Sequence, residues 1–256
     1  MYKCAVLMTL LISFLTLHTR GYAEQTDSSN ASYTKSKLIK LATLEWPPYS
    51  SQSLPGGGET VAKVVAAFKH MGYTVKIDFL PWSRAVRSTY GEQPLYLGYF
   101  PEYPLTDTHF LLSASLGDSI VGLVQHKNRK LNISNTLSLT QYRLGVVQDY
   151  VNTKEIDDLI AKGKIKPVIA IDDRQNLVRV LNGDIDAAVI DKHVMQYLLQ
   201  HDLQLSENAA GLLEFNDTLA QTISLHIAFS RYHPDAELYQ KFNTALFQLN
   251  QQNPAN

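Results

Sequence analysis

Charged and aromatic side chains recur directly after the apolar segments of this chain. Aromatic rings supply apolar contact at low entropic cost and can hold a cation over their faces. A guanidinium can grip a carboxylate through two parallel hydrogen bonds, and an aspartate can accept hydrogen bonds from an ammonium group. These residue types at these positions predict a pocket for a small polar molecule. The residues that we predict to contact it are Glu45, Trp46, Tyr49, Trp82, Arg84, Tyr99, Glu102, Tyr150 and Asp191.

Several of these residues also have a purely structural explanation. Trp46 and Trp82 are large enough to be core residues. Asp191 precedes a helix-like segment and can serve as its N-cap, and Arg84 can form an ion pair with Glu92. What favours a binding site is that the set gathers at the ends of predicted strands.

Other kinds of functional site find little support in the sequence. Seven of the eight histidines lie after residue 23, and they show neither His-x-x-x-His nor His-x-x-Glu-His spacing. The chain has no Gly-x-Ser-x-Gly segment, no Walker loop and no Gly-x-Gly-x-x-Gly fingerprint. We therefore expect no metal, no cofactor and no catalytic residue.

Composition and charge exclude further classes. The 256 residues are 45% hydrophobic and 18% charged, which is typical of a globular protein. Lys plus Arg number 23 against 24 for Asp plus Glu, so no basic excess indicates nucleic-acid binding. Cys4 is the single cysteine, which excludes a Cys-based zinc site, an iron–sulfur cluster and an intrachain disulfide.

The N-terminal residues have the layout of a secretory signal peptide. Lys3 precedes the apolar run 5–17, and Gly21-Tyr22-Ala23 places small residues where a signal peptidase reads them. A membrane anchor is the alternative, but a span needs about 20 apolar residues. We predict a signal peptide over 1–23 with cleavage after Ala23, then a flexible leader over 24–36, and hence a periplasmic protein.

From residue 38 onward, strand-like and helix-like segments alternate. This rhythm predicts an α/β fold with mainly parallel sheets and helices on both faces. In such folds, ligands lie at the carboxyl ends of the strands. The predicted strands are 38–44, 74–80, 95–100, 119–126, 142–147, 166–171, 185–190 and 223–229. Predicted helix starts are Gly56, Trp82, Asn152 (with Glu155 at capping-box spacing), Asp173, Asp191 and Pro234.

Three segments in this order resemble a bacterial family. They are Trp46-Pro47-Pro48-Tyr49, Pro81-Trp82-Ser83-Arg84-Ala85, and the run 182–191 that contains Gly183-Asp184-Ile185-Asp186-Ala187. Together they resemble the extracellular solute-binding proteins of family 3, the polar amino-acid receptors of ABC importers. The resemblance covers about residues 38–250.

This resemblance implies a type 2 periplasmic-binding-protein fold that closes over its ligand. Two α/β lobes would be joined by crossover strands at 119–127 and 222–229. Lobe 1 would comprise 37–124 plus 225–252, and lobe 2 would comprise 125–224. The family's ammonium-binding aspartate falls on Asp191, and its ligand-facing aromatic falls on Trp46 or Tyr49. The implied partners of this monomer are a small polar solute and the membrane subunits of an ABC transporter, with no nucleic acid.

The sequence departs from the family pattern at the position that recognises the carboxylate of an amino acid. Asp107 stands where the family usually has an arginine. The aspartate that the family usually carries early in the first helix has no clear match within 58–64. Three alternatives remain. Arg84 takes over the carboxylate, the ligand lacks one, or a cationic or polar ligand is held by Trp46, Tyr49, Glu102 and Asp191.

Two other functions are compatible with the same scaffold. Some proteins that resemble these receptors are periplasmic dehydratases of cyclic diene acids, in which a desolvated carboxylic acid acts as general acid. Glu45 and Glu102 are the candidates for that role. The other possibility is a ligand-sensing accessory module that signals to a membrane protein.

Overall fold

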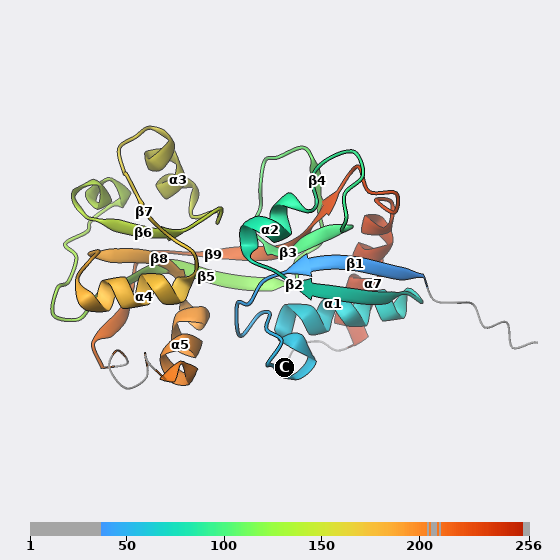
Figure 1. The fold of residues 1–256 in the computed structure, drawn as a ribbon, viewed down its shortest axis with the longest axis horizontal. Coiled ribbons are helices and arrows are strands. Elements are labelled where there is room, and N and C mark those ends of the chain that lie inside the picture. Colours follow the sequence, from blue (N-terminus) through green and yellow to red (C-terminus); the bar gives the residue numbers. More distant parts are fainter. Residues whose placement is uncertain (1–36, 204, 206–208, 210, 253–256) are drawn as a thin grey trace, which may run out of the picture. The chain divides into compact units, whose positions relative to one another are not determined.

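Two groups of parallel strands form the ends of one sheet in the computed structural model (Figure 1), which describes residues 37–203, 205, 209 and 211–252. The predicted signal peptide and leader, 1–23 and 24–36, lie outside these residues. Within them, no helix has the length and apolar character needed to cross a membrane. The described residues belong to one compact unit, Ser36–Asn256.

The first strand group, β1–β4, comes from the beginning of the described chain. In it, β1 pairs in parallel with both β2 and β3, from Leu38 opposite Thr74 and from Leu41 opposite Gly98. The bounds are β1 Leu38–Thr43, β2 Thr74–Phe79, β3 Gly98–Glu102 and β4 Phe110–Leu112.

The second strand group, β6–β8, repeats the parallel pattern. Here β6 pairs with β7 and with β8. The bounds are β6 Leu144–Val147, β7 Val168–Ala170 and β8 Ala187–Asp191. All five residues of β8 are buried, as expected for a strand with both faces covered.

Two long antiparallel strands, β5 (Gly117–His126) and β9 (Leu213–Ser230), connect the groups. The C-terminal half of β9 pairs with β3 and β4, and β5 pairs with β8. The strand order is therefore β2-β1-β3-β9-β5-β8-β6-β7, with β4 on β9. The α/β class is confirmed: among the described strands, each antiparallel pair involves β5 or β9.

Helices cover both strand groups (Figure 1). With the first group lie α1 Glu59–His70, α2 Trp82–Arg87 and α7 Leu238–Gln252; with the second lie α3 Lys154–Ala161, α4 Asp173–Asn182 and α5 Lys192–His201. Two short 3₁₀ helices span Pro55–Gly57 and Thr136–Gln141. The α1–α7 contact contains Phe68 and Phe242, with ring centroids 5.3 Å apart, and both rings are fully buried.

Several predicted boundaries are wrong. Strand β9 begins at Leu213 instead of residue 223, and α7 begins at Leu238 instead of Pro234. Helix α3 has Thr153 at its N-cap, because the Asn152 side chain donates to Asp157 instead of capping.

The predicted N-cap of α4 is also wrong by one position. Asp172, not Asp173, is the N-cap, and its carboxylate accepts the Gln175 N–H at 2.8 Å. This correction leaves the Asp173 side chain without a capping role.

The two-lobe boundaries stay a prediction. The proposed changes of lobe, at 124/125 and 224/225, fall inside β5 and β9, where these strands pair with each other. From Val121 onward, β5 also pairs with β8 of the second strand group.

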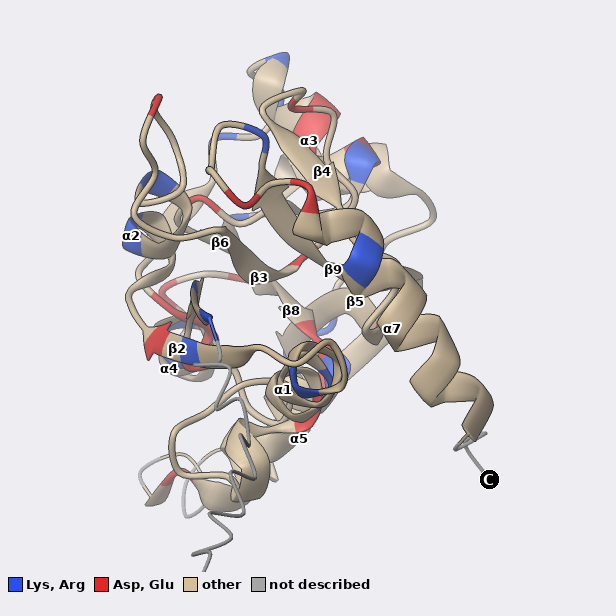
Figure 2. Ribbon diagram, turned by 90° about the vertical axis from the view of Figure 1, so that its right-hand side faces the viewer, with Lys and Arg blue, Asp and Glu red and all other residues tan. Residues whose placement is uncertain are grey.

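Charge is mixed over the described chain. Figure 2 shows the Lys and Arg segments interspersed with the Asp and Glu segments, and Lys241 is the one charged residue of α7. The basic run at 127–130 forms a turn after β5, where Lys130 pairs with Glu214 and Arg129 donates to the Val180 carbonyl. This run is tied to its surroundings.

Candidate functional site

The candidate site lies where strands of both groups end. The first strand group contributes the segments after β1 and β2 and the end of β3. The second group contributes the segment after β6, the first residue of α4 and the end of β8. The side chains from these positions are Trp46, Trp82, Glu102, Tyr103, Tyr150, Asp173 and Asp191. This is the strand-end location that the α/β pattern predicts.

The segment after β1 is a tight turn that fixes two aromatic rings. The Trp46 N–H donates to the Ser50 carbonyl at 2.6 Å, and the Ser50 hydroxyl donates to the Leu44 carbonyl at 2.9 Å. The Trp46 and Tyr49 rings stack with centroids 4.7 Å apart. Both side chains are buried, so the turn presents its aromatics inward.

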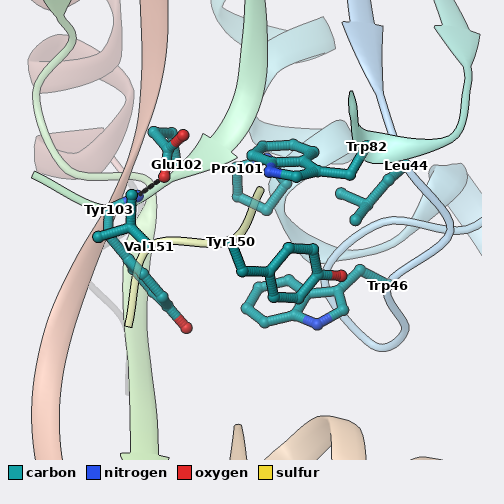
Figure 3. A pocket seen from close by; sticks show the side chains of 8 residues that line it. All are labelled: Leu44, Trp46, Trp82, Pro101, Glu102, Tyr103, Tyr150 and Val151. Carbon is teal, nitrogen blue, oxygen red and sulfur yellow. Dashed lines mark hydrogen bonds between the residues drawn. The ribbon is translucent and has the colours of Figure 1, made fainter. Parts of the chain in front are cut away.

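Four rings surround the inner part of the site. Tyr150 lies edge-on to Trp46 and to Trp82, with centroid distances of 6.4 and 5.9 Å and interplanar angles of 85° and 82°. Tyr103 meets Trp46 at 6.4 Å and 74°. Figure 3 shows Trp46, Tyr150 and Trp82 close together, with Glu102 and Tyr103 facing them. Rings set at right angles form the walls of a box.

Asp173 lies at this site with its carboxyl group buried. Its residue exposure is 5%, and its Oδ2 accepts the Trp46 indole N–H at 3.0 Å. Burial raises the pKa of Asp173 to about 7, because the charged form loses hydration and no cation offsets the loss. The carboxyl therefore exchanges a proton near neutral pH.

Glu102 is the second buried carboxyl. It is 4% exposed at the end of β3, and its Oε1 accepts the Tyr103 backbone N–H at 2.8 Å (Figure 3). Burial raises the pKa of Glu102 to about 7, and hydrogen bonds from Tyr103 and Tyr99 partly oppose this rise. Glu102 therefore also exchanges a proton near neutral pH.

Asp191 is a hydrogen-bond hub as well as a helix cap. Its Oδ1 accepts the Val194 N–H at 2.8 Å, which confirms the predicted N-cap of α5. Its Oδ2 accepts from the Ser119 hydroxyl at 2.6 Å, the Ile120 N–H at 3.0 Å and the Tyr49 hydroxyl at 3.0 Å. Burial raises the pKa of Tyr49, so its hydroxyl stays protonated and donates.

Most predicted site residues are brought together. Trp46, Tyr49, Trp82, Glu102, Tyr150 and Asp191 line the inner cavities or contact a residue that does. Tyr99 lies behind Trp82 as a fully buried ring, 5.3 Å from it, and hydrogen-bonds Glu102.

Two predicted residues lie elsewhere. Glu45 is exposed, accepts the Gln52 N–H at 3.1 Å, and borders only an outer cavity. Arg84 is exposed on α2 and lines none of the cavities around the site. Arg84 follows Trp82 by two residues in α2, which corresponds to a rotation of about 200° around the helix axis. Because Trp82 points inward, Arg84 points outward.

Asp173 is a site residue that was not predicted from the sequence. Its sequence neighbour Asp172 is chemically identical, and one of the two must cap α4. The Asp172-Asp173 pair was the available signal in the sequence. Because only one aspartate can be the N-cap of α4, the other needs a different role. Tyr103, buried and hydrogen-bonded to the Ser119 hydroxyl at 2.7 Å, was also missed.

The space inside the site is small. Two inner cavities measure about 20 Å³ and about 10 Å³, room for roughly one water molecule each. An outer cavity of about 290 Å³ shares Trp46, Tyr150 and Asp173 with the inner ones. Among the described residues, no group of three or more His, Cys, Asp or Glu side chains is placed to hold a metal ion.

Comparison with solved structures shows the fold. A histidine kinase sensor domain with similarity to periplasmic binding proteins has a TM-score of 0.69 at 15% identity, over 86% of this chain and 92% of that one. The arginine-, lysine-, histidine-binding protein ArtJ from Geobacillus stearothermophilus gives 0.67 at 17% identity, over 85% and 91%. AncCDT-1, an ancestral amino-acid-binding protein and precursor of cyclohexadienyl dehydratase, gives 0.64 at 16%, over 84% and 89%.

These similarities establish that the chain has the fold of periplasmic binding proteins. No family model matches the sequence, and no curated protein matches it.

Proposed function

We propose that this protein is an extracytoplasmic solute-binding protein of family 3 that captures a small polar solute between its two strand groups. One observation carries the proposal: two buried carboxyl groups, Glu102 and Asp173, meet a box of aromatic rings at the strand ends. Burying a carboxyl without a charged partner is costly. Buried carboxyl groups without a charged partner are typical of a site that binds a polar ligand.

Capture would proceed by closure of the two strand groups on the solute. Trp46 and Trp82 belong to the first group, and Asp173 and Tyr150 to the second, so a solute among them contacts both groups. Contacts made only in the closed form shift the equilibrium toward closure.

Export and delivery complete the proposed role. The signal peptide over 1–23 would direct the protein to the periplasm, and the closed form would dock on the membrane subunits of an ABC importer. Arginine- and lysine-binding in structural neighbours such as ArtJ supports an amino-acid-like or cationic solute. Cross-linking in cells, followed by mass spectrometry of the captured membrane protein, distinguishes an importer from a sensor kinase.

A thermal-shift panel of amino acids, amines and small peptides tests the binding role. A specific solute present at 100 times its Kd should stabilise the protein by about 2.7 kcal/mol. For a chain of this size, that corresponds to a rise of roughly 5–10 °C in Tm. Absence of a response to every solute in the panel contradicts the proposal.

A second candidate function is an enzyme on the same scaffold, and Glu102 is the observation that favours it. A buried carboxyl with a pKa of about 7 suits a general acid, and the fold is shared with a precursor of cyclohexadienyl dehydratase. Glu45 is exposed and fits this role poorly. Turnover of a cyclic diene acid that Glu102→Gln lowers at least 100-fold would support an enzyme; equal rates in both proteins would contradict it.

A further inference from the structure

The inner part of the site contains three carboxyl groups without a basic partner. Glu102, Asp173 and Asp191 line the two inner cavities, and no described Lys, Arg or His lines either of them. Among the described residues, none of these three carboxyls forms an ion pair with a basic side chain. A ligand with a carboxylate would therefore meet repulsion here.

Basic residues around the site are otherwise engaged. His193 Nδ1 lies 3.0 Å from the Tyr49 hydroxyl. Arg174 borders the outer cavity, but its Nε donates to Asp202 at 2.6 Å. Arg84 is exposed on α2, outside these cavities. Asp107, at the family's arginine position, accepts the Tyr90 hydroxyl at 2.5 Å and the His109 N–H at 2.8 Å. No described side chain is placed to grip a ligand carboxylate in the inner cavities.

The aromatic box suits a cation. Trp46 is edge-on to Tyr103 and Tyr150, Trp82 is edge-on to Tyr150, and all four rings line the inner cavities. A cation over a ring face gains electrostatic energy, and more when it is desolvated. The aromatic rings and the carboxyl groups thus both favour a positively charged ligand.

Asp173 also indicates which kind of cation fits. Its Oδ2 accepts an N–H from Trp46, in a direction that a ligand N–H can replace. Trp46 and Tyr150 border both the outer and the inner cavities, so movement of the indole opens a path to Asp173. A cation that displaces the indole preserves this hydrogen bond if it carries a donor such as the N–H of an amine or guanidine.

From these observations we infer that the solute is an organic cation with an N–H group and no carboxylate, a primary amine or guanidine, bound against Asp173 inside the aromatic box. This inference rests on the proposed solute-binding function and narrows its substrate class. The ordinary α-amino acid is excluded as the preferred ligand.

Proton release accompanies binding of such a cation. The groups facing Asp173 are Tyr150, Asp172 and Asp191, with Glu45 and Arg174 across the outer cavity. The groups facing Glu102 are Tyr99 and Tyr103, with His226 opposite it on β9, and its charge also reaches Tyr90 and Tyr150. Both carboxyls have a pKa of about 7 before binding, and the cation lowers it. Affinity should therefore rise about tenfold between pH 6 and pH 8 for one such group.

Calorimetric titration with matched pairs tests the inference. The purified protein is titrated with agmatine and arginine, and with cadaverine and lysine; each pair differs by a carboxylate. We expect at least one amine to bind tenfold or more tightly than its amino acid, with affinity increasing from pH 6 to pH 8. Tighter binding of the amino acids, or of tetramethylammonium, which has no N–H, overturns the inference.

Three variants locate the binding site. Asp173→Asn should weaken amine binding at least tenfold and remove the part of its pH dependence that comes from Asp173, whereas Asp217→Asn, an exposed charge-matched control, should leave both unchanged. A loss of affinity on Arg84→Ala would indicate recognition of a carboxylate and overturn the inference. Binding of amino acids alone refutes only the inference. Failure of every solute in the wider panel refutes the proposed function as well.

Discussion

At the scale of single residues, the site contains two buried carboxyl groups whose ionised forms are unfavourable. Asp173 and Glu102 are both at most 5% exposed, and hydrogen bonds alone stabilise their ionised forms. An apolar or amide side chain of similar size would cost less in the unliganded protein. Residues that lower the stability of the folded protein in this way are concentrated at functional sites.

The substitution Asp173→Asn should stabilise the unliganded protein more at pH 8 than at pH 5. The folded pKa of about 7 exceeds the usual value of 3.8, so between these values the folded chain keeps a proton that the unfolded chain releases. Stability from this group therefore falls as pH rises through that window. At about 1.4 kcal/mol per pH unit, we expect a gain of ~2 kcal/mol or more at pH 8.

Urea unfolding at pH 5 and pH 8 measures this difference. Asp217→Asn, which removes an exposed carboxylate, is the control and should change stability equally at both pH values. An Asp173→Asn effect that is the same at pH 5 and pH 8 would show that the carboxyl is not protonated in the folded protein.

At the scale of elements, α1 can start where it does because Gly58 lets two segments touch. Gly58 has φ +97°, and a Cβ there would lie 2.7 Å from the Tyr49 carbonyl and 2.8 Å from the Pro48 carbonyl. The same contact lets the N–H groups of Glu59 and Thr60 donate to those carbonyls. The start of α1 thus fixes the turn that carries Tyr49.

Gly58→Ala should destabilise the protein more than Gly72→Ala does. Gly72 also has a positive φ, +81°, but nothing lies within 4 Å of its missing Cβ. The backbone conformation alone should cost about 1–2 kcal/mol at Gly72. At Gly58, where φ is +97° and ψ is 173°, it should cost about 1–3 kcal/mol, and the clash should add ~1–3 kcal/mol. Equal losses in thermal unfolding would mean that the turn yields to the methyl group.

Elements with a periodic pattern were predictable from the sequence, and elements that depend on a partner were not. The apolar residues of β1 and α1 identify both. The first half of β9 contains the polar residues Glu214 and Asn216, and it is a strand because they pair with Gln125 and Leu123 of β5. Strand formation of this kind depends on cross-strand context more than on local preference.

The candidate site was predictable to a similar degree. The order of strands indicated which loops converge, so Trp46, Glu102 and Tyr150 were found. The role of Asp173 depends on a one-residue shift of the α4 cap, below the precision with which sequence defines a helix end. Arg84 lies outside because Trp82 uses the inward face of the short helix α2.

At the scale of the whole described molecule, hydrogen bonds from Trp46, Tyr49 and Trp82 link the two strand groups without a ligand. Trp46 donates to Asp173, Tyr49 donates to Asp191, and the Trp82 indole donates to the Asp149 carbonyl at 2.9 Å. With inner cavities of about 20 and 10 Å³, the protein's own side chains fill the site. A solute therefore has to compete with these internal bonds.

Removing two of these donors should shift the unliganded protein toward an open form. The double variant Trp46→Phe with Trp82→Phe keeps aromatic rings and deletes both indole N–H groups. At about 1 kcal/mol per hydrogen bond, the ratio of open to closed molecules should rise roughly 30-fold.

Pulsed electron resonance between two spin labels measures that ratio. Cys4 is the only native cysteine, so Cys4→Ser permits labelling at Arg87→Cys and Lys162→Cys, both exposed and one beside each strand group. The control variant Tyr96→Phe with Tyr142→Phe deletes donors to Asp78 and Asn132, whose bonds stay within one group. A longer distance should appear in the tryptophan variant alone. Identical distance distributions in both folded variants would mean that packing, and not these bonds, holds the groups together.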